Sequence, residues 1–165
     1  MVKTTYVQMF ARPDRTVPPP REGISIIHAR NPTIAYYRWL YDAVGGKWNW
    51  TSRKKLSDAA LAAIIHDPRD EVHVLFVDGV PAGFVELDRR IEGEIEISQF
   101  GLMAEFIGQG LGKYFLQCAV DRAWSYGPGR LWLHTCTLDH PNALPTYRKA
   151  GFVLYKQETK EREPL

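Results

Sequence analysis

Three glycines at alternate positions, Gly108, Gly110 and Gly112, are the residues of this sequence best suited to holding a ligand. They follow a strand-like run over 94–102 and coincide with the start of an amphipathic helical pattern over 109–124. Glycine has no Cβ, so backbone N–H groups can approach a ligand closely, and positive φ costs little. The helix start adds unpaired N–H donors and the positive end of its dipole. Glycines also serve plain turns, but this spacing favours an anion site, most often for phosphate.

Two common phosphate-binding motifs do not fit this loop. A Walker loop needs four residues between its first glycine and a Gly-Lys-Ser/Thr sequence. Only three residues separate Gly108 from Gly112 and Lys113, and Tyr114 cannot hold Mg²⁺ as a serine or threonine would. The dinucleotide fingerprint needs a glycine at position 113, which is lysine. The sequence therefore disfavours sites for nucleoside triphosphates and for NAD.

The remaining pattern, Gly108-Gln-Gly-Leu-Gly112 at the end of a strand, resembles the acyl-CoA pyrophosphate loop of the GNAT superfamily of N-acyltransferases. A second segment is similar to the same family, because its Ala-x-x-x-Tyr-x-x-x-Gly-Phe pattern is matched by Ala143, Tyr147, Gly151 and Phe152. Together the two segments and the strand between them cover roughly the C-terminal third to half of the chain. Their order and spacing make the resemblance specific.

The sequence departs from the family pattern at two positions. Ile107 stands where the family loop usually begins with Arg or Gln, so one contact to the phosphates is either missing or supplied by Lys113. His140 stands where an Asn usually lies near the start of the last helix, and Asn142 follows two residues later. These departures concern the contacts to CoA and leave the family resemblance intact.

The resemblance implies an α/β (α+β) fold with a mixed, mostly antiparallel sheet flanked by helices and splayed between the fourth and fifth core strands. The residue patterns agree with such a mixed α/β layer. Asp78-Gly79 is typical of a type I′ hairpin turn. The patterns predict strands over 6–11, 24–28, 72–77, 80–87, 91–102, 131–137 and 152–156. They predict helices over 33–44, 59–66, 109–124 and 143–149.

Length and composition predict one domain over 1–165, since 165 residues with 45% apolar side chains can bury a substantial core. The net charge of +2 and the scattered basic residues argue against nucleic-acid or membrane partners. No signal-peptide pattern appears, so we expect a cytoplasmic protein, and dimers are common among similar folds. Within the domain we expect an N-terminal strand and proline-rich connector (1–23), a helical acceptor-side region (31–66), the pyrophosphate-binding strand-loop-helix (94–125) and a C-terminal strand-helix-strand (130–158).

By resemblance the co-substrate is acetyl-CoA, and no metal is expected. Backbone N–H groups of the glycine loop would hold the pyrophosphate through Ile107, Gly108, Gln109, Gly110, Leu111, Gly112 and Lys113. Phe100, Gly101 and Leu102 would line the pantetheine through their backbone, and the Leu102 N–H would stabilise the oxyanion. His140 and Asn142 are further candidates for contact with CoA.

Tyr147 is the candidate acid that protonates the leaving thiolate, because a phenol with a pKa near 10 is protonated at neutral pH. The alternative is a core tyrosine packed beside Ala143. The candidate base is Glu96, which lies at the position of the glutamate used by histone-type members of the family. Glu86, Glu94 and a chain of water molecules are alternatives to Glu96.

His134, Cys136 and His140 could form a cysteine nucleophile or a zinc site, but ordinary packing is favoured because no Cys-x-x-Cys pattern is present. Aromatic side chains are dense in the acceptor-side region, and they could stack on an acceptor or pack in the core. The candidate acceptor contacts are Tyr36, Trp39, Trp48, Trp50 and Glu86. We expect transfer of an acetyl or short acyl group from acetyl-CoA to a small-molecule or peptide amine. A non-catalytic acyl-CoA-sensing or partner-binding module is the alternative.

Overall fold

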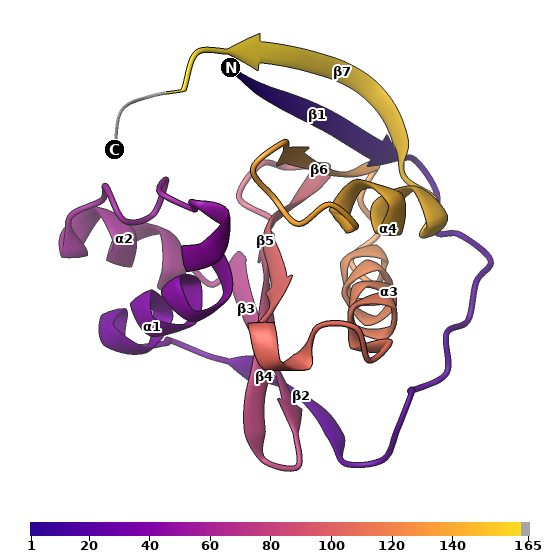
Figure 1. Ribbon diagram of the computed structural model, residues 1–165, viewed down its shortest axis with the longest axis horizontal. Coiled ribbons are helices and arrows are strands. Elements are labelled where there is room, and N and C mark those ends of the chain that lie inside the picture. The colour runs from indigo at the N-terminus through magenta and orange to yellow at the C-terminus, as the bar shows by residue number, and fades with distance from the viewer. Residues whose placement is uncertain (163–165) are drawn as a thin grey trace.

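A computed structural model describes residues 1–162 as one seven-stranded sheet with helices on both faces (Figure 1). The strands are β1 (Val2–Met9), β2 (Ile24–Ala29), β3 (Asp70–Val77), β4 (Val80–Asp88), β5 (Glu94–Leu102), β6 (Arg130–Cys136) and β7 (Val153–Lys160). The helices are α1 (Ile34–Gly45), α2 (Asp58–Ile65), α3 (Leu111–Trp124) and α4 (Ala143–Lys149), with the 3-10 turns η1 (Gly46–Trp48) and η2 (Ala104–Phe106). Residues 163–165 of the expected domain lie outside the described residues.

Local signals in the sequence account for several element boundaries. The Thr33 hydroxyl accepts a hydrogen bond from the Tyr36 N–H (3.2 Å) and caps α1, while Ser57 caps α2 in the same way. Asp78 and Gly79 adopt φ of 50° and 78°, so the turn between β3 and β4 has the two positive values that a type I′ turn requires. The predicted hairpin is therefore confirmed.

The strand order is β2-β3-β4-β5-β6-β1-β7, and every neighbouring pair is antiparallel except β5 and β6. This arrangement confirms the predicted mixed, mostly antiparallel fold. The expected boundaries of the first strand were wrong, because it runs from Val2 to Met9 and Phe10 is 63% exposed. This strand lies between β6 and β7, where Tyr6 pairs with His134 on one side and with Lys156 on the other.

The parallel pair β5 and β6 separates shortly after it begins. Only residues 94–96 of β5 pair with 130–132 of β6. From Ile97 to Leu102, β5 keeps its partner β4 but has no strand partner on the other edge. This is the splay between the fourth and fifth strands of the sheet order, and it leaves main-chain groups of β5 available to a ligand.

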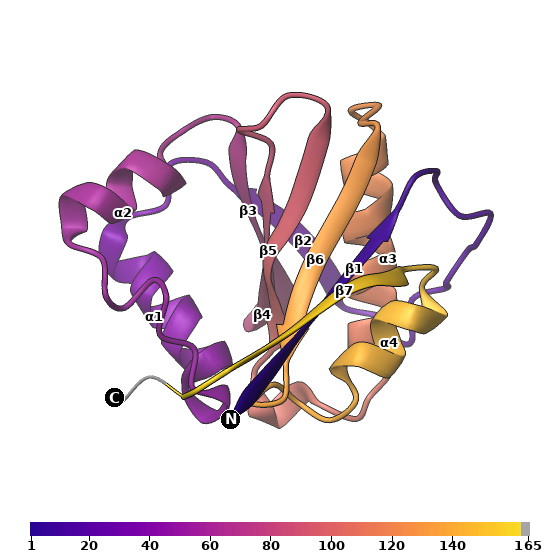
Figure 2. The ribbon, with the colours of Figure 1, turned by 90° about the horizontal axis from the view of Figure 1, so that it is seen from above.

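Helices cover both faces of the sheet, with α1 and α2 on one side and α3 and α4 on the other (Figure 2). On the first side, Tyr37 and Leu40 of α1 pack in a buried cluster with Phe84 of β4. On the second side, Phe115 and Leu116 of α3 pack in another cluster whose members include residues of β4, β5 and β6. Burying side chains of this size contributes about 1.5–3 kcal/mol each, so β5 and β6 are held firmly on either side of the splay. Over residues 1–162, no helix has the length and apolar character needed to cross a membrane.

Candidate active site

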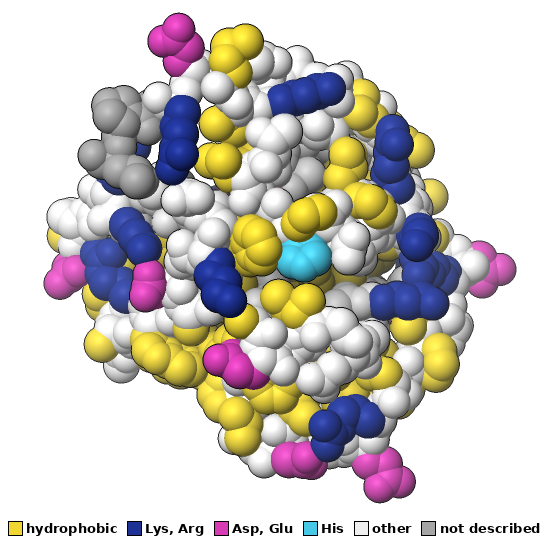
Figure 3. All heavy atoms as spheres, in the orientation of Figure 1, with side chains coloured by type: hydrophobic (Ala, Val, Ile, Leu, Met, Phe, Trp, Pro, Cys, Tyr) yellow, Lys and Arg dark blue, Asp and Glu magenta, His cyan; other side chains and the backbone are white. Residues whose placement is uncertain are grey.

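A cavity of about 660 Å³ opens where β5 and β6 separate. Its walls come from the second half of β5, the end of β6, the loop after η1, the glycine loop and α4. On the face shown in Figure 3, hydrophobic side chains gather around a histidine in a hollowed region. The volume lies within the usual range for small-molecule sites, roughly 300–1,000 Å³.

One end of the cavity is formed by backbone N–H groups at the start of α3. Gly110 is the N-cap residue of α3, its φ is 79°, and no side chain caps the helix. The first turn holds no acidic residue, and Lys113 lines the cavity from that turn. Gly108, with φ of 84°, and Gly112 also line the cavity. Uncapped N–H groups, the helix dipole and a nearby lysine fit the diphosphate of acetyl-CoA.

The middle of the cavity is lined by the free edge of β5, through Phe100, Gly101 and Leu102. Gly101 has no room for a side chain, because a Cβ there would lie 2.5 Å from Cγ1 of Val44 on α1. The absence of a side chain at Gly101 therefore lets α1 pack directly on β5. The three residues that the sequence predicted for pantetheine thus line the same cavity as the start of α3, called the anion end below, and the part around Glu96, Trp48 and Trp50, called the acceptor end.

Tyr147 reaches the cavity from α4 and is 7% exposed. Its ring makes edge contacts with Phe100 (6.1 Å between centroids) and Phe152 (6.2 Å). Burial, followed by the charge of Asp139, raises the pKa of the Tyr147 phenol above its usual value. The hydroxyl therefore keeps its proton at neutral pH and can donate it inside the cavity.

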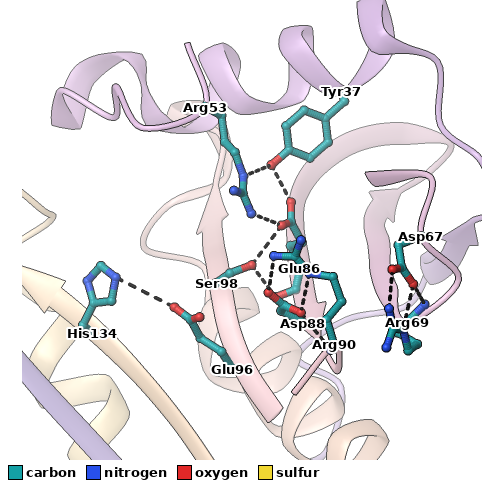
Figure 4. Close-up of polar contacts among 10 residues, drawn as sticks. All are labelled: Tyr37, Arg53, Asp67, Arg69, Glu86, Asp88, Arg90, Glu96, Ser98 and His134. Carbon is teal, nitrogen blue, oxygen red and sulfur yellow. Dashed lines mark hydrogen bonds and ion pairs between the residues drawn. The ribbon is translucent and has the colours of Figure 1, made fainter. Parts of the chain in front are cut away.

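Glu96 of β5 lines the cavity, and its side chain is 23% exposed. Burial, followed by the charge of Asp88, raises the pKa of its carboxyl to about 7. The nearest basic group is His134 of β6, whose Nε2 lies 3.8 Å from Glu96 Oε1 (Figure 4). Burial lowers the pKa of His134, so this imidazole is neutral at pH 7 and provides no charge to hold Glu96 ionised.

Glu86 lies away from the cavity, contrary to the prediction that it contacts the acceptor. The side chain is 0% exposed and is enclosed by donors (Figure 4). Arg53 NH2 donates to its Oε2 at 2.5 Å, and Ser98 Oγ donates to the same oxygen at 3.0 Å. The Tyr37 hydroxyl donates to Oε1. A carboxylate with these partners serves to fix Arg53 and α1, and it is poorly placed to act as the base. The other alternative, Glu94, is paired with Arg130 at 3.1 Å.

Of the predicted acceptor contacts, Trp48 and Trp50 line the cavity. Tyr36 and Trp39 do not line it. Their rings stack at 6.3 Å, with Trp39 49% exposed and Tyr36 partly buried against the cluster beneath α1. The helical spacing of these rings did not reveal which of them face the sheet. The structure thus retains two of the four rings at the site.

Some of the residues predicted to contact CoA line the cavity, and others do not. Gln109 and Leu111 do not line the cavity, since Gln109 bonds back to the Glu105 carbonyl (3.1 Å) and Leu111 is fully buried in the core. Ile107, His140 and Asn142 do line it. The N–H of Asn142 donates to His140 Nδ1 at 3.0 Å, which fixes the tautomer of that ring.

Asp139, which sequence reasoning missed, joins two walls of the cavity. Its Oδ1 accepts from Trp50 Nε1 (3.2 Å), and its Oδ2 accepts from Thr135 Oγ1 (2.6 Å) and the Cys136 N–H (2.8 Å). Beside it, the rings of Trp48 and His140 meet edge to face at 5.1 Å. Asp side chains in turns often bond to nearby backbone groups, and that local tendency was the one available signal.

The Cys136 thiol lines the cavity, but burial raises its pKa, so it is not activated as a nucleophile. A separate cluster, His28, Glu71 and His73, brings potential ligand atoms within 4.8 Å of one another. Glu71 already accepts from His73 (2.8 Å), Arg89 (2.9 Å), Arg122 (3.2 Å) and Tyr126. The carboxylate oxygens of Glu71 are therefore already occupied by hydrogen-bond donors, which indicates a structural role rather than metal binding.

The family follows from this geometry together with the sequence. A sequence model of the acetyltransferase (GNAT) family matches residues 33–152, which span the splay, the glycine loop and Tyr147. The chain belongs to the GNAT family. The GNAT fold also accounts for the opening between β5 and β6 that forms the cavity.

Solved structures with the same fold include a GCN5-related N-acetyltransferase from Sphaerobacter thermophilus (TM-score 0.68, 17% identity, covering 94% of this chain and 49% of that one). An aminoglycoside acetyltransferase from an uncultured soil metagenomic sample has a TM-score of 0.66 and 13% identity, covering 87% and 97%. An IAA acetyltransferase from Bacillus cereus has a TM-score of 0.60 and 21% identity, covering 81% and 79%. This GNAT chain spans about half the length of the first of these structures. No curated protein matches this chain.

Proposed function

We propose that this GNAT chain transfers an acetyl or short acyl group from acetyl-CoA to a primary amine by direct attack in a ternary complex. The observation that carries the proposal is the placement of Glu96 and Tyr147 on the same cavity as the uncapped start of α3. An ionisable carboxylate with a pKa of about 7 and a protonated phenol are the two groups that such a transfer needs. The proposal requires the thioester to lie beside both groups when the diphosphate occupies the start of α3.

In this mechanism Glu96 accepts a proton from the acceptor ammonium, and the neutral nitrogen attacks the thioester carbonyl carbon. The Leu102 N–H donates to the oxygen as it gains negative charge. The carbon–sulfur bond then breaks, and Tyr147 gives its proton to the departing sulfur. The nitrogen loses its second proton, which restores the Tyr147 phenol through solvent, and Glu96 releases the first proton to solvent. The products are the acetylated amine, CoA and one released proton.

The test is release of free CoA thiol from acetyl-CoA in the presence of a panel of amines, with the acetylated product identified by mass. We expect turnover by the wild-type chain. Tyr147→Phe should bind acetyl-CoA normally and lower kcat by about 10²–10⁴-fold, the usual contribution of a general acid. Unchanged kcat in this variant would remove Tyr147 from the mechanism.

Two other results would redirect the proposal. Binding of acetyl-CoA without turnover of any amine would favour a non-catalytic acyl-CoA-sensing module. Binding of ATP in preference to acetyl-CoA would show that the anion end holds a nucleotide. Calorimetry with both ligands detects the second result before any amine is tested, and the amine panel decides the first.

A further inference from the structure

The acceptor end of the cavity contains two cations, and both are already neutralised by carboxylates. Arg53 is 14% exposed and holds the buried Glu86 at 2.5 Å. Arg90 donates to both oxygens of Asp88, from Nε at 3.0 Å and from NH2 at 2.8 Å. In each pair the carboxylate already balances the charge of the guanidinium, although some of its N–H donors remain. Within the described residues, neither arginine therefore offers an unbalanced positive charge to a second, anionic group on the acceptor.

The acids at the same end are also occupied, with one exception. Asp88 is held by Arg90, and Asp139 accepts three hydrogen bonds. Among the cavity-lining carboxylates within the described residues, Glu96 is the one to which no lysine, arginine or hydroxyl donates. One unpaired carboxylate can receive one ammonium. A second ammonium on the acceptor would lose its hydration without gaining a carboxylate partner, and this desolvation costs free energy.

The rest of the acceptor end is aromatic. Trp50 is fixed against α1, because its ring occupies the space where a Cβ on Gly45 would lie, only 2.3 Å away. The ring of Trp48 contacts that of His140 edge to face, with 5.1 Å between centroids. Tyr41 adds a third ring, and it contacts Trp50 at 5.4 Å between centroids. Fixed rings of this kind favour an apolar or aromatic body near a single ammonium.

We infer that the acceptor is a primary monoamine on an aromatic or apolar body, with neither a carboxylate nor a second ammonium. This inference rests on the proposed function, since it names the substrate class of the same site. The inferred class excludes amino acids as acceptors. It also excludes polycations such as sisomicin, which is bound in a structure of the metagenomic aminoglycoside acetyltransferase.

The experiment compares kcat/KM of the wild-type chain for four amines under saturating acetyl-CoA. Phenethylamine carries one amine and a ring, phenylalanine adds a carboxylate, spermidine adds further ammonium groups, and propylamine lacks the ring. We expect phenethylamine to exceed each of the others by at least about tenfold, equivalent to roughly 1.4 kcal/mol. Equal or higher kcat/KM for phenylalanine or spermidine would overturn the inferred class while leaving acetyl transfer established.

Two tryptophan variants provide a matched pair. Trp48→Ala removes a ring from the cavity, whereas Trp39→Ala removes an exposed ring from the outer side of α1. We expect Trp48→Ala to lower kcat/KM for phenethylamine by about tenfold and for propylamine by less than about twofold, since only the larger body contacts the ring. Trp39→Ala should change neither. An equal loss for both amines in Trp48→Ala would overturn the inference that Trp48 contacts the acceptor body.

Failure of the inference and failure of the proposed function give different results. If all four amines are inert while calorimetry detects acetyl-CoA binding, both the transfer and the substrate class are overturned. If any amine is acetylated, the transfer stands, and the order of the four kcat/KM values decides the class alone.

Discussion

The two ends of the cavity are built in different ways. The anion end comes from one continuous stretch, in which the turn before α3 presents main-chain N–H groups. The acceptor end is assembled from side chains of β4, β5, β6 and the loop after η1, which meet only in the folded chain. A backbone site tolerates sequence change as long as the turn keeps its shape. A side-chain site depends on each contact that fixes its side chains, so single substitutions can change which acceptor it binds. Related chains can therefore differ most easily at the acceptor end.

Removing the Glu96 carboxylate tests the acceptor end most severely. Glu96→Gln keeps the shape but cannot accept a proton, so we expect kcat to fall by about 10²–10⁴-fold, while acetyl-CoA binding at the other end is unchanged. Steady-state rates and calorimetry measure the two effects. A fall in rate below tenfold would show that a water chain serves as the base.

The value of kcat should also depend on pH through the ionisation of Glu96. The base must be ionised, and the pKa of Glu96 is about 7, so kcat should rise as pH increases through 7 and level off above it. Below pH 7 the carboxyl is protonated and the rate falls. Glu96→Gln should lack this step near pH 7, and a step that persists in the variant would assign it to another group.

Breaking the pair between Arg53 and Glu86 tests whether the acceptor end depends on its fixed ion pairs. Arg53→Met leaves the fully buried Glu86 without its cation, and we expect a loss of about 3–5 kcal/mol in the free energy of unfolding. Urea denaturation at pH 7 measures this loss. The double variant Arg53→Met with Glu86→Gln should recover a large part of it, because the buried charge is gone. No recovery would mean that Arg53 contributes chiefly through packing.

Gly110→Glu tests the anion end. A side chain at φ of 79° is strained, and its Cβ would lie 3.4 Å from Cβ of Pro20. The added negative charge at the N-cap of α3 also opposes a diphosphate there, so the Kd for acetyl-CoA should rise by about a hundredfold. Gly93→Glu is the matched control, because Gly93 has φ of 81°, has open space around it and lies outside the cavity lining. Equal binding by both variants would show that the loop does not hold acetyl-CoA.

The smallest effect is expected at the contact that joins the two walls. Asp139→Asn replaces an acceptor oxygen with an amide N–H that would face one of three donors, at a cost of about 1–3 kcal/mol. Because Trp50 then loses its anchor, KM for the amine should rise a few fold and KM for acetyl-CoA should change less. A larger change for acetyl-CoA would place Asp139 with the anion end.

The contrast between the ends also explains how much the sequence could predict. The glycine loop and Tyr147 could be singled out because their signals lie in short continuous segments, and both line the cavity. The fold was predicted from the same segments and is confirmed. Glu86 and Glu96 lie on neighbouring strands, and the pattern alone could not separate them. Their pairing contains a register shift between Glu86 and Leu87, which side-chain alternation does not show. Asp139 and the position of β1 depend on contacts between distant parts of the chain.

The position of β1 determines how late in folding the cavity can be completed. Thr4 lines the cavity, and its strand pairs with β6 and β7, which end at Cys136 and Lys160. Pairings of such large sequence separation form slowly, because much of the chain must close into a loop first. A chain emerging from the ribosome can therefore build the β2–β5 meander early. Strand β1 stays without partners until β6 and β7 have been made.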